Sequence, residues 1–307
     1  MAGVEGHWVM GRSRRLWVWM WVGLALSLGV QLGSCDRSPP PTRTRLTVGL
    51  VSYDTTAASV ETYAPFRQYL ETALAATVEV EPVFNEIRAV EQIQAQAWEV
   101  VFAPAGLAAI AIDEAQYVPL FPLQGTPNQR AVIVVPAESE AQTLSDLANT
   151  TIALGEPGSA TGYYLPLYDL YGLTLQAIRF APTPKTVLEW LAQGEVAAGA
   201  LAEEDFQQYR GEFGAGAFRV LHESRLINSG AVLLSPRVER NLQRLLEDAM
   251  KAAPANLAYD AGYIPNATVP DFSQLIQLVE KVRPLEERVR EQPATLTLEP
   301  LPPATAP

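Results

Sequence analysis

The residues with the clearest chemical potential lie in the segment ALGEPGSATGYYLP, from Ala153 to Pro166. An apolar stretch typical of a strand ends there, and glycines, hydroxyl residues and aromatic residues follow. Ser159, Ala160 and Thr161 stand at the predicted start of a helix, where backbone N–H groups lack partners and the helix dipole is positive. Such amides and hydroxyls suit an anion. A plain N-cap by Ser159 explains the same local pattern equally well.

Ser159 could alternatively be the nucleophile of a hydrolase, but the sequence gives this hypothesis little support. The strained strand-to-helix turn of such enzymes requires G-x-S-x-G, whereas Pro157 and Thr161 stand two residues before and after Ser159. The catalytic base would have to be His222, because the other histidine, His7, lies in the N-terminal segment. We therefore expect a binding protein rather than an enzyme.

The sequence also disfavours a metal site and a cofactor. Cys35 is the only cysteine, and no spacing of acidic residues and histidine is typical of a zinc site. The glycine spacing between Gly155 and Gly162 departs from the G-x-G-x-x-G of dinucleotide-binding loops, and Pro157 removes one amide from the loop. We expect neither a metal ion nor a cofactor.

A second hydroxyl-rich helix start lies in GLVSYDTTAAS, from Gly49 to Ser59. Tyr53, Asp54 and Thr55 end the first predicted strand there and open the first predicted helix. If the two helix starts belong to facing halves of the molecule, they can contact one shared ligand. Asp54 would repel a bare anion, so it either selects a protonated oxyanion or serves as another cap.

Residues 1–35 are typical of an export signal. Three arginines precede the uninterrupted apolar stretch LWVWMWVGLALSLGV, which is short for a membrane span. LGSC, from Leu32 to Cys35, resembles the site cut by the lipoprotein signal peptidase, so we expect residues 1–35 to be a lipoprotein signal peptide. Cys35 would carry the lipid that anchors the protein to the membrane, and the proline-rich residues 36–44 would form a disordered tether.

Charge and size narrow the class of protein further. The chain has 307 residues and a formal net charge of −12. An acidic surface without a basic patch disfavours a nucleic-acid partner, although a pocket inside an acidic protein can be locally positive. The length beyond the export signal favours two domains of modest size.

Strand-like and helical patterns alternate from Leu46 onwards, which predicts an α/β protein. Runs such as LTVGLV and AVIVVP are separated by segments with helical periodicity such as VETYAPFRQYLETAL. The series occurs twice, so we expect two doubly wound units with a cleft where strand ends and helix starts converge. We assign residues 45–130 and 231–290 to lobe 1, residues 131–230 to lobe 2, and residues 291–307 to a disordered tail.

Four segments together resemble the phosphonate/phosphate-binding lipoproteins of ABC transporters, the PhnD-like branch of type II periplasmic binding proteins. The most specific segment is TLSDLANTTIALGEPGSATGYYLP. The others are KTVLEWLAQGEVAAGAL, the opening LTVGLVSYDT with YAPFRQYLE, and RLINSGAVLLSPRV. The resemblance covers about Leu46 to Met250. It implies a two-lobed periplasmic-binding-protein (flytrap) fold, in which each lobe is a doubly wound mixed sheet flanked by helices.

The resemblance also implies a function. Proteins of this family close on a small tetrahedral oxyanion outside the cytoplasm and deliver it to an ABC transporter permease, without a cofactor. The implied ligand-binding residues come from both lobes and from the segment that returns to the first lobe. By position they are Tyr53, Asp54, Thr55, Ser159, Ala160, Thr161, Asn228 and Ser229.

This sequence departs from the family pattern at three positions. Ala160 replaces a hydroxyl residue, Pro184 stands where a histidine is frequent, and Gly230 stands where an acidic residue would meet the amine of an aminoalkyl phosphonate. We therefore expect a simple oxyanion (phosphate, phosphite or phosphonate) rather than a zwitterionic one. An alternative is the same fold reused as a sensor or scaffold with another ligand. A hydrolase that uses Ser159 and His222 is a less favoured alternative.

Overall fold

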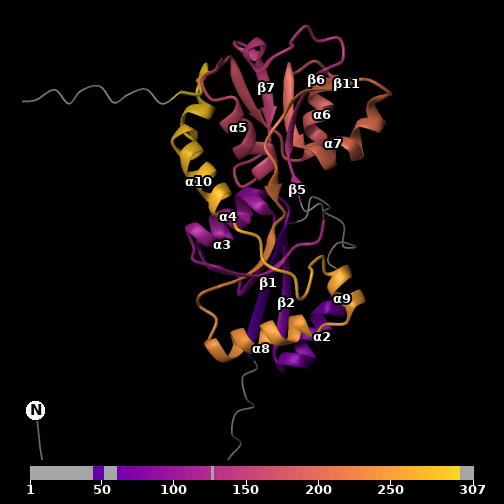
Figure 1. Cartoon of the computed structure of the whole chain (residues 1–307), viewed down its shortest axis with the longest axis vertical. Helices are drawn as coiled ribbons and strands as arrows, with labels where there is room; N and C mark the ends of the chain where they lie inside the picture. Colours follow the sequence, from indigo (N-terminus) through magenta and orange to yellow (C-terminus); the bar gives the residue numbers. More distant parts are fainter. Residues whose placement is uncertain (1–43, 52–60, 126–127, 298–307) are drawn as a thin grey trace, which may run out of the picture. The chain divides into compact units, whose positions relative to one another are not determined.

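The computed structural model describes residues 44–51, 61–125 and 128–297 (Figure 1). The predicted signal peptide, the lipid-anchor residue Cys35 and residues 36–43 of the predicted tether lie outside this part of the chain. Within the described ranges, no helix is both long enough and apolar enough to cross a membrane.

Five strands form the first sheet, in the order β2-β1-β3-β13-β4. β1 pairs in parallel with β2 and β3, whereas β13, which returns from much later in the chain, is antiparallel to β3 and β4. Every residue of β3 and β13 is buried, because helices cover both faces of the sheet. The strands are β1 (Arg45–Val51), β2 (Thr77–Val83), β3 (Val100–Ala103), β4 (Val118–Pro122) and β13 (Ala231–Leu234).

The helices of the first sheet follow from their apolar patterns. In α2, Phe66 and Leu70 lie one turn apart and both are buried against β1 and β3. α4 is apolar on nearly every side, and seven of its nine residues are buried. These helices are α2 (Ala64–Leu74), α3 (Glu86–Gln94), α4 (Ala105–Asp113), α8 (Arg240–Lys251) and α9 (Ala255–Asp260).

The second sheet repeats the design of the first, with the order β11-β6-β10-β7-β9. β7 pairs in parallel with β9 and β10, and β6 is antiparallel to β10 and β11. Both sheets are therefore mixed. The strands are β6 (Ala131–Pro136), β7 (Thr151–Leu154), β9 (Ala177–Phe180), β10 (Ala198–Ala202) and β11 (Phe218–Glu223).

Short helices surround the second sheet. Thr183 begins α6 by accepting a hydrogen bond from the Thr186 amide (3.2 Å), and Pro184 occupies the first helical position, where its missing N–H costs nothing. The helical segments are η1 (Leu144–Leu147), η2 (Ala160–Tyr164), α5 (Leu165–Asp169), α6 (Pro184–Ala192), α7 (Glu203–Tyr209) and η3 (Arg210–Phe213).

Two short strands link the sheets. β5 (Asn128–Gln129) leads into the second sheet and pairs with β12 (Ile227–Asn228), which leads back to the first. Arg130, next to this pair, forms ion pairs with Glu203 (3.2 Å) and Glu223. The two crossing segments are therefore joined by the backbone hydrogen bonds between β5 and β12, and the ion pairs of Arg130 lie beside this pair.

The C-terminal segment packs differently from the prediction. α10 (Ser273–Val282) packs on both α4 and α5, and β14 (Ala294–Thr295) pairs with β8 (Thr174–Leu175) beside the second sheet. η4 (Arg283–Leu285) and η5 (Arg288–Arg290) connect α10 to β14. Residues 291–297 were expected in a disordered tail, but Leu296 is completely buried, and its amide donates to the Leu173 carbonyl oxygen (2.8 Å).

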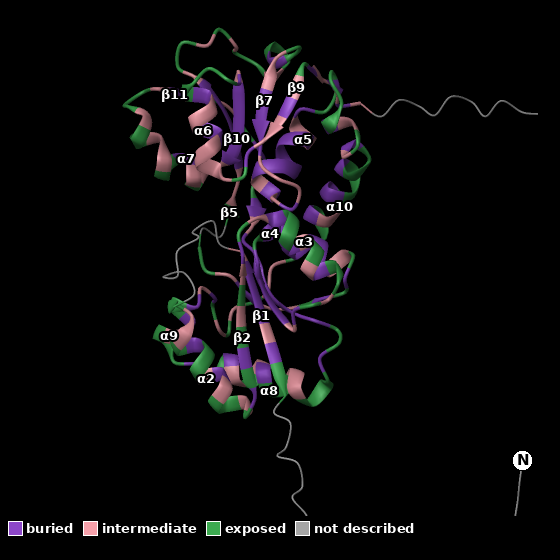
Figure 2. Cartoon of the chain, turned by 180° about the vertical axis from the view of Figure 1, so that it is seen from behind, coloured by how far each residue is buried: buried purple, intermediate pink, exposed green. Residues whose placement is uncertain are grey.

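A continuous apolar core joins the two sheets. The cluster that contains Val101 of β3 and Leu107 of α4 also contains Tyr163, Leu165 and Leu278, from η2, α5 and α10. Figure 2 shows the two sheets and α4 largely buried, with exposed residues on the outer faces of the helices. The two α/β units are therefore joined in two ways. They share hydrophobic packing along α4, η2 and α10, and they are linked by the β5–β12 strand pair.

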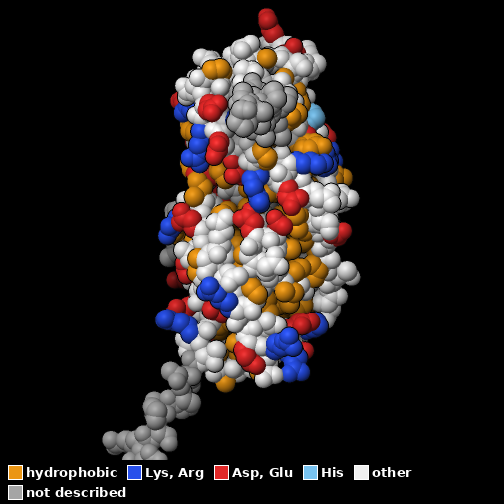
Figure 3. Space-filling view, turned by 90° about the vertical axis from the view of Figure 1, so that its left-hand side faces the viewer, with side chains coloured by type: hydrophobic (Ala, Val, Ile, Leu, Met, Phe, Trp, Pro, Cys, Tyr) orange, Lys and Arg blue, Asp and Glu red, His pale blue; other side chains and the backbone are white. Residues whose placement is uncertain are grey.

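A small charged cluster borders this shared packing. Arg283, at the end of α10, forms ion pairs with Asp113 (3.7 Å) and Glu114 at the end of α4. Figure 3 views the face on which α3 and α10 lie and shows acidic and basic side chains gathered at mid-height. Because these side chains are partly exposed, each pair contributes modestly to stability.

Candidate functional site

The loop from β7 to η2 brings the predicted anion-binding residues to the first sheet. Gly158 has a φ of +110°, which favours glycine, and a Cβ there would lie 2.7 Å from the Cβ of Glu86 in α3. At Gly106, in the first turn of α4, a Cβ would lie 2.2 Å from the Gly158 oxygen and 2.6 Å from the Ala160 nitrogen. The two glycines therefore allow the loop to pack against α3 and α4.

The hydrogen bonds of Ser159 confirm that it caps the helix. Its Oγ accepts from the Gly162 amide (3.0 Å), and its carbonyl oxygen accepts from the amides of Tyr163 (3.2 Å) and Tyr164 (3.1 Å). Among the described residues, the amides of Ala160 and Thr161 have no such acceptor. The α4 backbone lies against the Ala160 amide, so Thr161 is the better placed of the two to donate to a ligand.

Two small cavities lie beside this helix start. One has a volume of about 50 Å³ and is bordered by Glu156, Thr183 and Pro184, and the other has about 180 Å³ and is bordered by Pro104 and Gln129. Both are lined by residues from the first sheet's helices and from the second sheet. The residues shared by the two cavities are Glu86, Ser159, Thr161, Ala202 and Asp205. We call the two cavities together the cleft cavities.

The cleft cavities are acidic. Four carboxylate residues line them, and in the described part of the chain no lysine or arginine does; the four are Glu86, Glu156, Glu204 and Asp205. Burial, with a smaller contribution from the Glu204 charge, raises the pKa of Asp205 to about 6. Burial also raises the pKa of Glu156, whose Oε2 is buried and has no hydrogen-bond partner among the described residues.

This charge decides which anions can enter. A fully ionised oxyanion would face several carboxylates, and no lysine or arginine among the described lining residues would offset their charge, which is unfavourable at short range. An oxyanion that keeps a proton can donate that proton to a carboxylate and accept hydrogen bonds from Thr161 with its other oxygens. An ammonium group on the ligand would serve the carboxylates equally well.

The structure brings only some of the predicted ligand residues together. Ser159, Ala160 and Thr161 line the same cavity. Asn228 and Ser229 do not line either cleft cavity: the Asn228 side-chain amide donates to the Asp271 carbonyl oxygen (2.8 Å), and Ser229 is buried. Tyr53, Asp54 and Thr55 lie outside the described residues.

The structure does not bring His222 to Ser159. His222 lies on β11, and its Nε2 is 3.1 Å from Oδ2 of Asp169 at the end of α5. Burial raises the pKa of Asp169, and His222 opposes this shift. His222 lines neither cleft cavity, so the site offers Ser159 no histidine base among the described residues.

Sequence reasoning missed the carboxylates. The departure at Gly230 suggests a cleft without a partner for an amine, yet α3, α7 and the loop before η2 supply Glu86, Asp205 and Glu156. Each of these residues lies at or near a helix start, where an acidic side chain is ordinary because it complements the helix dipole. The sequence around each of these carboxylates therefore gave little indication that it lines a binding site.

The comparisons with known proteins identify the family. Residues 48–263 match the family described as "ABC transporter, phosphonate, periplasmic substrate-binding protein", and the chain belongs to this family. No curated protein sequence matches the chain significantly.

Solved structures show the same fold. XAC2383 from Xanthomonas citri, bound to chloride ion, superposes with a TM-score of 0.67 at 17% identity, covering 78% of this chain and 99% of that chain. PhnD1 from Prochlorococcus marinus, in complex with methylphosphonate, superposes with a TM-score of 0.60 at 16% identity, covering 78% and 98%. A binding protein component of an ABC phosphonate transporter from Pseudomonas aeruginosa gives 0.59 at 14% identity, covering 80% and 98%. The predicted two-lobed periplasmic-binding-protein fold is confirmed.

Proposed function

We propose that this periplasmic substrate-binding protein is anchored to the membrane by lipid on Cys35, and that it delivers a small tetrahedral oxyanion to an ABC transporter permease. The oxyanion is phosphate, phosphite or a phosphonate, in a form that carries a proton. The observation that carries the ligand proposal is the position of Thr161, which stands at a helix start and lines both cleft cavities together with Glu86 and Asp205. Donors and carboxylates that line the same cavities suit a ligand that both accepts and donates hydrogen bonds.

A thermal-shift screen tests the ligand proposal. The ligands are phosphate, phosphite, methylphosphonate, 2-aminoethylphosphonate, sulfate and taurine, each at pH 5.5 and pH 8. A ligand at about one hundred times its dissociation constant stabilises the folded state by about 2.7 kcal/mol. We expect at least one of the three phosphorus oxyanions to raise the melting temperature, more strongly at pH 5.5, and sulfate, which has no proton at either pH, to have no effect.

A second candidate is the binding-protein fold reused as a sensor or scaffold. The close packing of Gly106 against Gly158 and Ala160 favours it, because it leaves cavities of only about 50 and 180 Å³. No response to any of the six ligands would support this candidate and count against the transport ligand. A stronger response to 2-aminoethylphosphonate than to methylphosphonate would instead show that the carboxylates bind an ammonium group.

The lipid anchor has its own test. In a bacterial host that processes lipoproteins, the chain should label with radioactive palmitate and remain with the membrane fraction. A Cys35→Ser variant should lose the label. Equal labelling of the variant and the unchanged chain would contradict the anchor without affecting the ligand proposal.

A further inference from the structure

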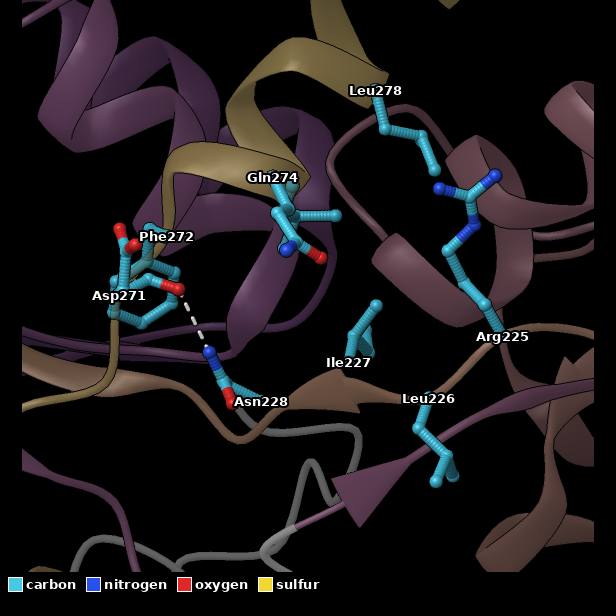
Figure 4. A pocket seen from close by; sticks show the side chains of 9 residues that line it. Arg225, Leu226, Ile227, Asn228, Asp271, Phe272, Gln274 and Leu278 are labelled. Atoms are coloured by element: carbon cyan, nitrogen blue, oxygen red, sulfur yellow. Dashed lines mark hydrogen bonds between the residues drawn. The ribbon is translucent and has the colours of Figure 1, made fainter.

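A third cavity lies on the β12 segment, away from the cleft cavities. It has a volume of about 240 Å³ and lies between residues 225–228 and residues 271–278, at the start of α10 (Figure 4). It shares no lining residue with either cleft cavity. We call it the hinge cavity, because β12 is one of the two strands that link the sheets.

Two of its polar side chains are already occupied. The Asn228 side chain turns towards Asp271 and donates to its carbonyl oxygen (2.8 Å), as the dashed line in Figure 4 shows. The Asp271 carboxylate accepts from the Ser273 amide (2.9 Å) and hydroxyl (2.6 Å), which lowers its pKa. Asp271 therefore stays ionised at neutral pH and contributes negative charge to the rim.

Two other polar side chains are available to a ligand. Arg225 stacks on Tyr168, with 4.4 Å between its Cζ and the ring centroid, and in the described ranges it forms no ion pair. The nearby Asp169 is hydrogen-bonded to His222, and the charges of both His222 and Arg225 oppose the rise of the Asp169 pKa that burial causes. The Gln274 side-chain amide, which likewise has no hydrogen-bond partner among the described residues, points into the cavity in Figure 4, while the Arg225 guanidinium extends towards Leu278.

The remaining wall is apolar. Ile227, Leu275 and Leu278 are 8%, 6% and 3% exposed and form the part of the cavity between β12 and α10. One cation, one amide and an aliphatic wall define a ligand that is charged at one end and apolar at the other. A second negative charge on the ligand would find no second lysine or arginine among the described residues that line the cavity.

We propose that the hinge cavity is a second ligand site, which binds a small monocarboxylate with a compact apolar body. The carboxylate pairs with the Arg225 guanidinium, whose planar N–H edge matches two carboxylate oxygens, and also accepts from Gln274. The apolar body packs against Ile227, Leu275 and Leu278, which are already largely buried, so dispersion contacts rather than newly buried protein surface supply its contribution. Stacking on Tyr168 holds the guanidinium in place before the ligand arrives.

A ligand in the hinge cavity would contact the segments that link the two sheets. Its two walls are β12, which pairs with β5, and α10, which packs on α4 and α5. A ligand between them adds contacts between the returning strand and the helix that touches both α/β units. The cleft cavities use other residues, so this proposal does not depend on the identity of the cleft ligand.

Calorimetric titration of the full chain with benzoate and with benzamide tests the proposal. Benzamide has nearly the same shape but no charge, so it isolates the contribution of Arg225. We expect saturable one-to-one binding of benzoate and at least tenfold weaker binding of benzamide. Arg225→Gln should weaken the binding of benzoate at least tenfold, and Gln274→Leu should weaken it several-fold.

Controls separate this site from the cleft. Thr161→Val should leave benzoate affinity unchanged, and Arg225→Gln should leave the response to methylphosphonate unchanged. Absence of saturable benzoate binding to the folded wild-type chain, or equal affinity for benzoate and benzamide, would overturn the proposal. Unchanged benzoate affinity in a folded Arg225→Gln variant would also overturn the proposal. If the cleft does not bind a phosphonate, only the response to methylphosphonate would be lost, and benzoate binding would remain.

Discussion

The cleft cavities and the hinge cavity lie in the same acidic protein but differ in the charged groups that line them. Glu86, Glu156 and Asp205 line the cleft without a described lysine or arginine, whereas Arg225 lines the hinge cavity together with Asp271. The cleft offers donors only from a helix start and the hydroxyls beside it, while the hinge offers a guanidinium and an amide. Net charge therefore says little about either site, because each cavity has its own local field.

The two sites also differ in how tightly they are built. The cleft cavities, of about 50 and 180 Å³, lie where the Gly106 and Gly158 backbones approach closely, whereas the hinge cavity has a volume of about 240 Å³. The ligand that we propose for the cleft is therefore compact and protonated. The ligand that we propose for the hinge is larger and singly charged.

The largest expected effect comes from adding volume beside the cleft. Gly106→Val would place atoms against the Gly158 oxygen and the Ala160 nitrogen, which are backbone atoms that cannot turn aside. We expect a loss of about 3 kcal/mol in the free energy of unfolding, measured by urea denaturation. Gly211→Val is the matched control, because no atom lies within 4 Å of a Cβ there, and it should change stability far less.

A smaller effect is expected from removing one ligand donor. Thr161→Val keeps the shape of the side chain and removes its hydroxyl, so affinity for the cleft ligand should fall by about 1.5–3 kcal/mol. The matched control is Thr72→Val, since Thr72 bonds to the Gln68 carbonyl oxygen on an exposed helix face. Equal affinity of both variants for the cleft ligand would show that the Thr161 hydroxyl does not bind the ligand. The cleft would then differ from the hinge cavity only in its carboxylates.

The smallest expected effect is a pH dependence that belongs to the cleft alone. The pKa of Asp205 is about 6 in the folded protein and near its ordinary value when unfolded, so the folded state binds this proton more tightly. Stability should fall as pH rises from about 4 to 6 and stay lower above that range, by about 1–2 kcal/mol. Asp205→Asn should remove this slope in urea denaturation curves measured across the range, and benzoate binding at the hinge should be unaffected. An unchanged slope would show that Asp205 is not the group responsible.

Much of the fold could be predicted from the sequence because strand and helix patterns are local. Alternating strand and helix patterns predicted two α/β units, and the family resemblance implied mixed sheets. The hydroxyl before the helix was consistent with a cap by Ser159, which its hydrogen bond from the Gly162 amide confirms. The C-terminal end could not be predicted in this way. Residues 291–297 lack periodicity, and only their packing beside the second sheet buries Leu296.

The sequence by itself determined the elements, the capped helix start at Ser159 and the family pattern, since these depend on residues close together in the chain. Only the tertiary structure decided the charge and size of the sites. Glu86 and Asp205 are more than a hundred positions apart, yet they line the same cavities, and Arg225 and Gln274 line one cavity although they are far apart in the sequence. No local pattern encodes such proximity, because it depends on how the two sheets and the returning C-terminal helix pack together.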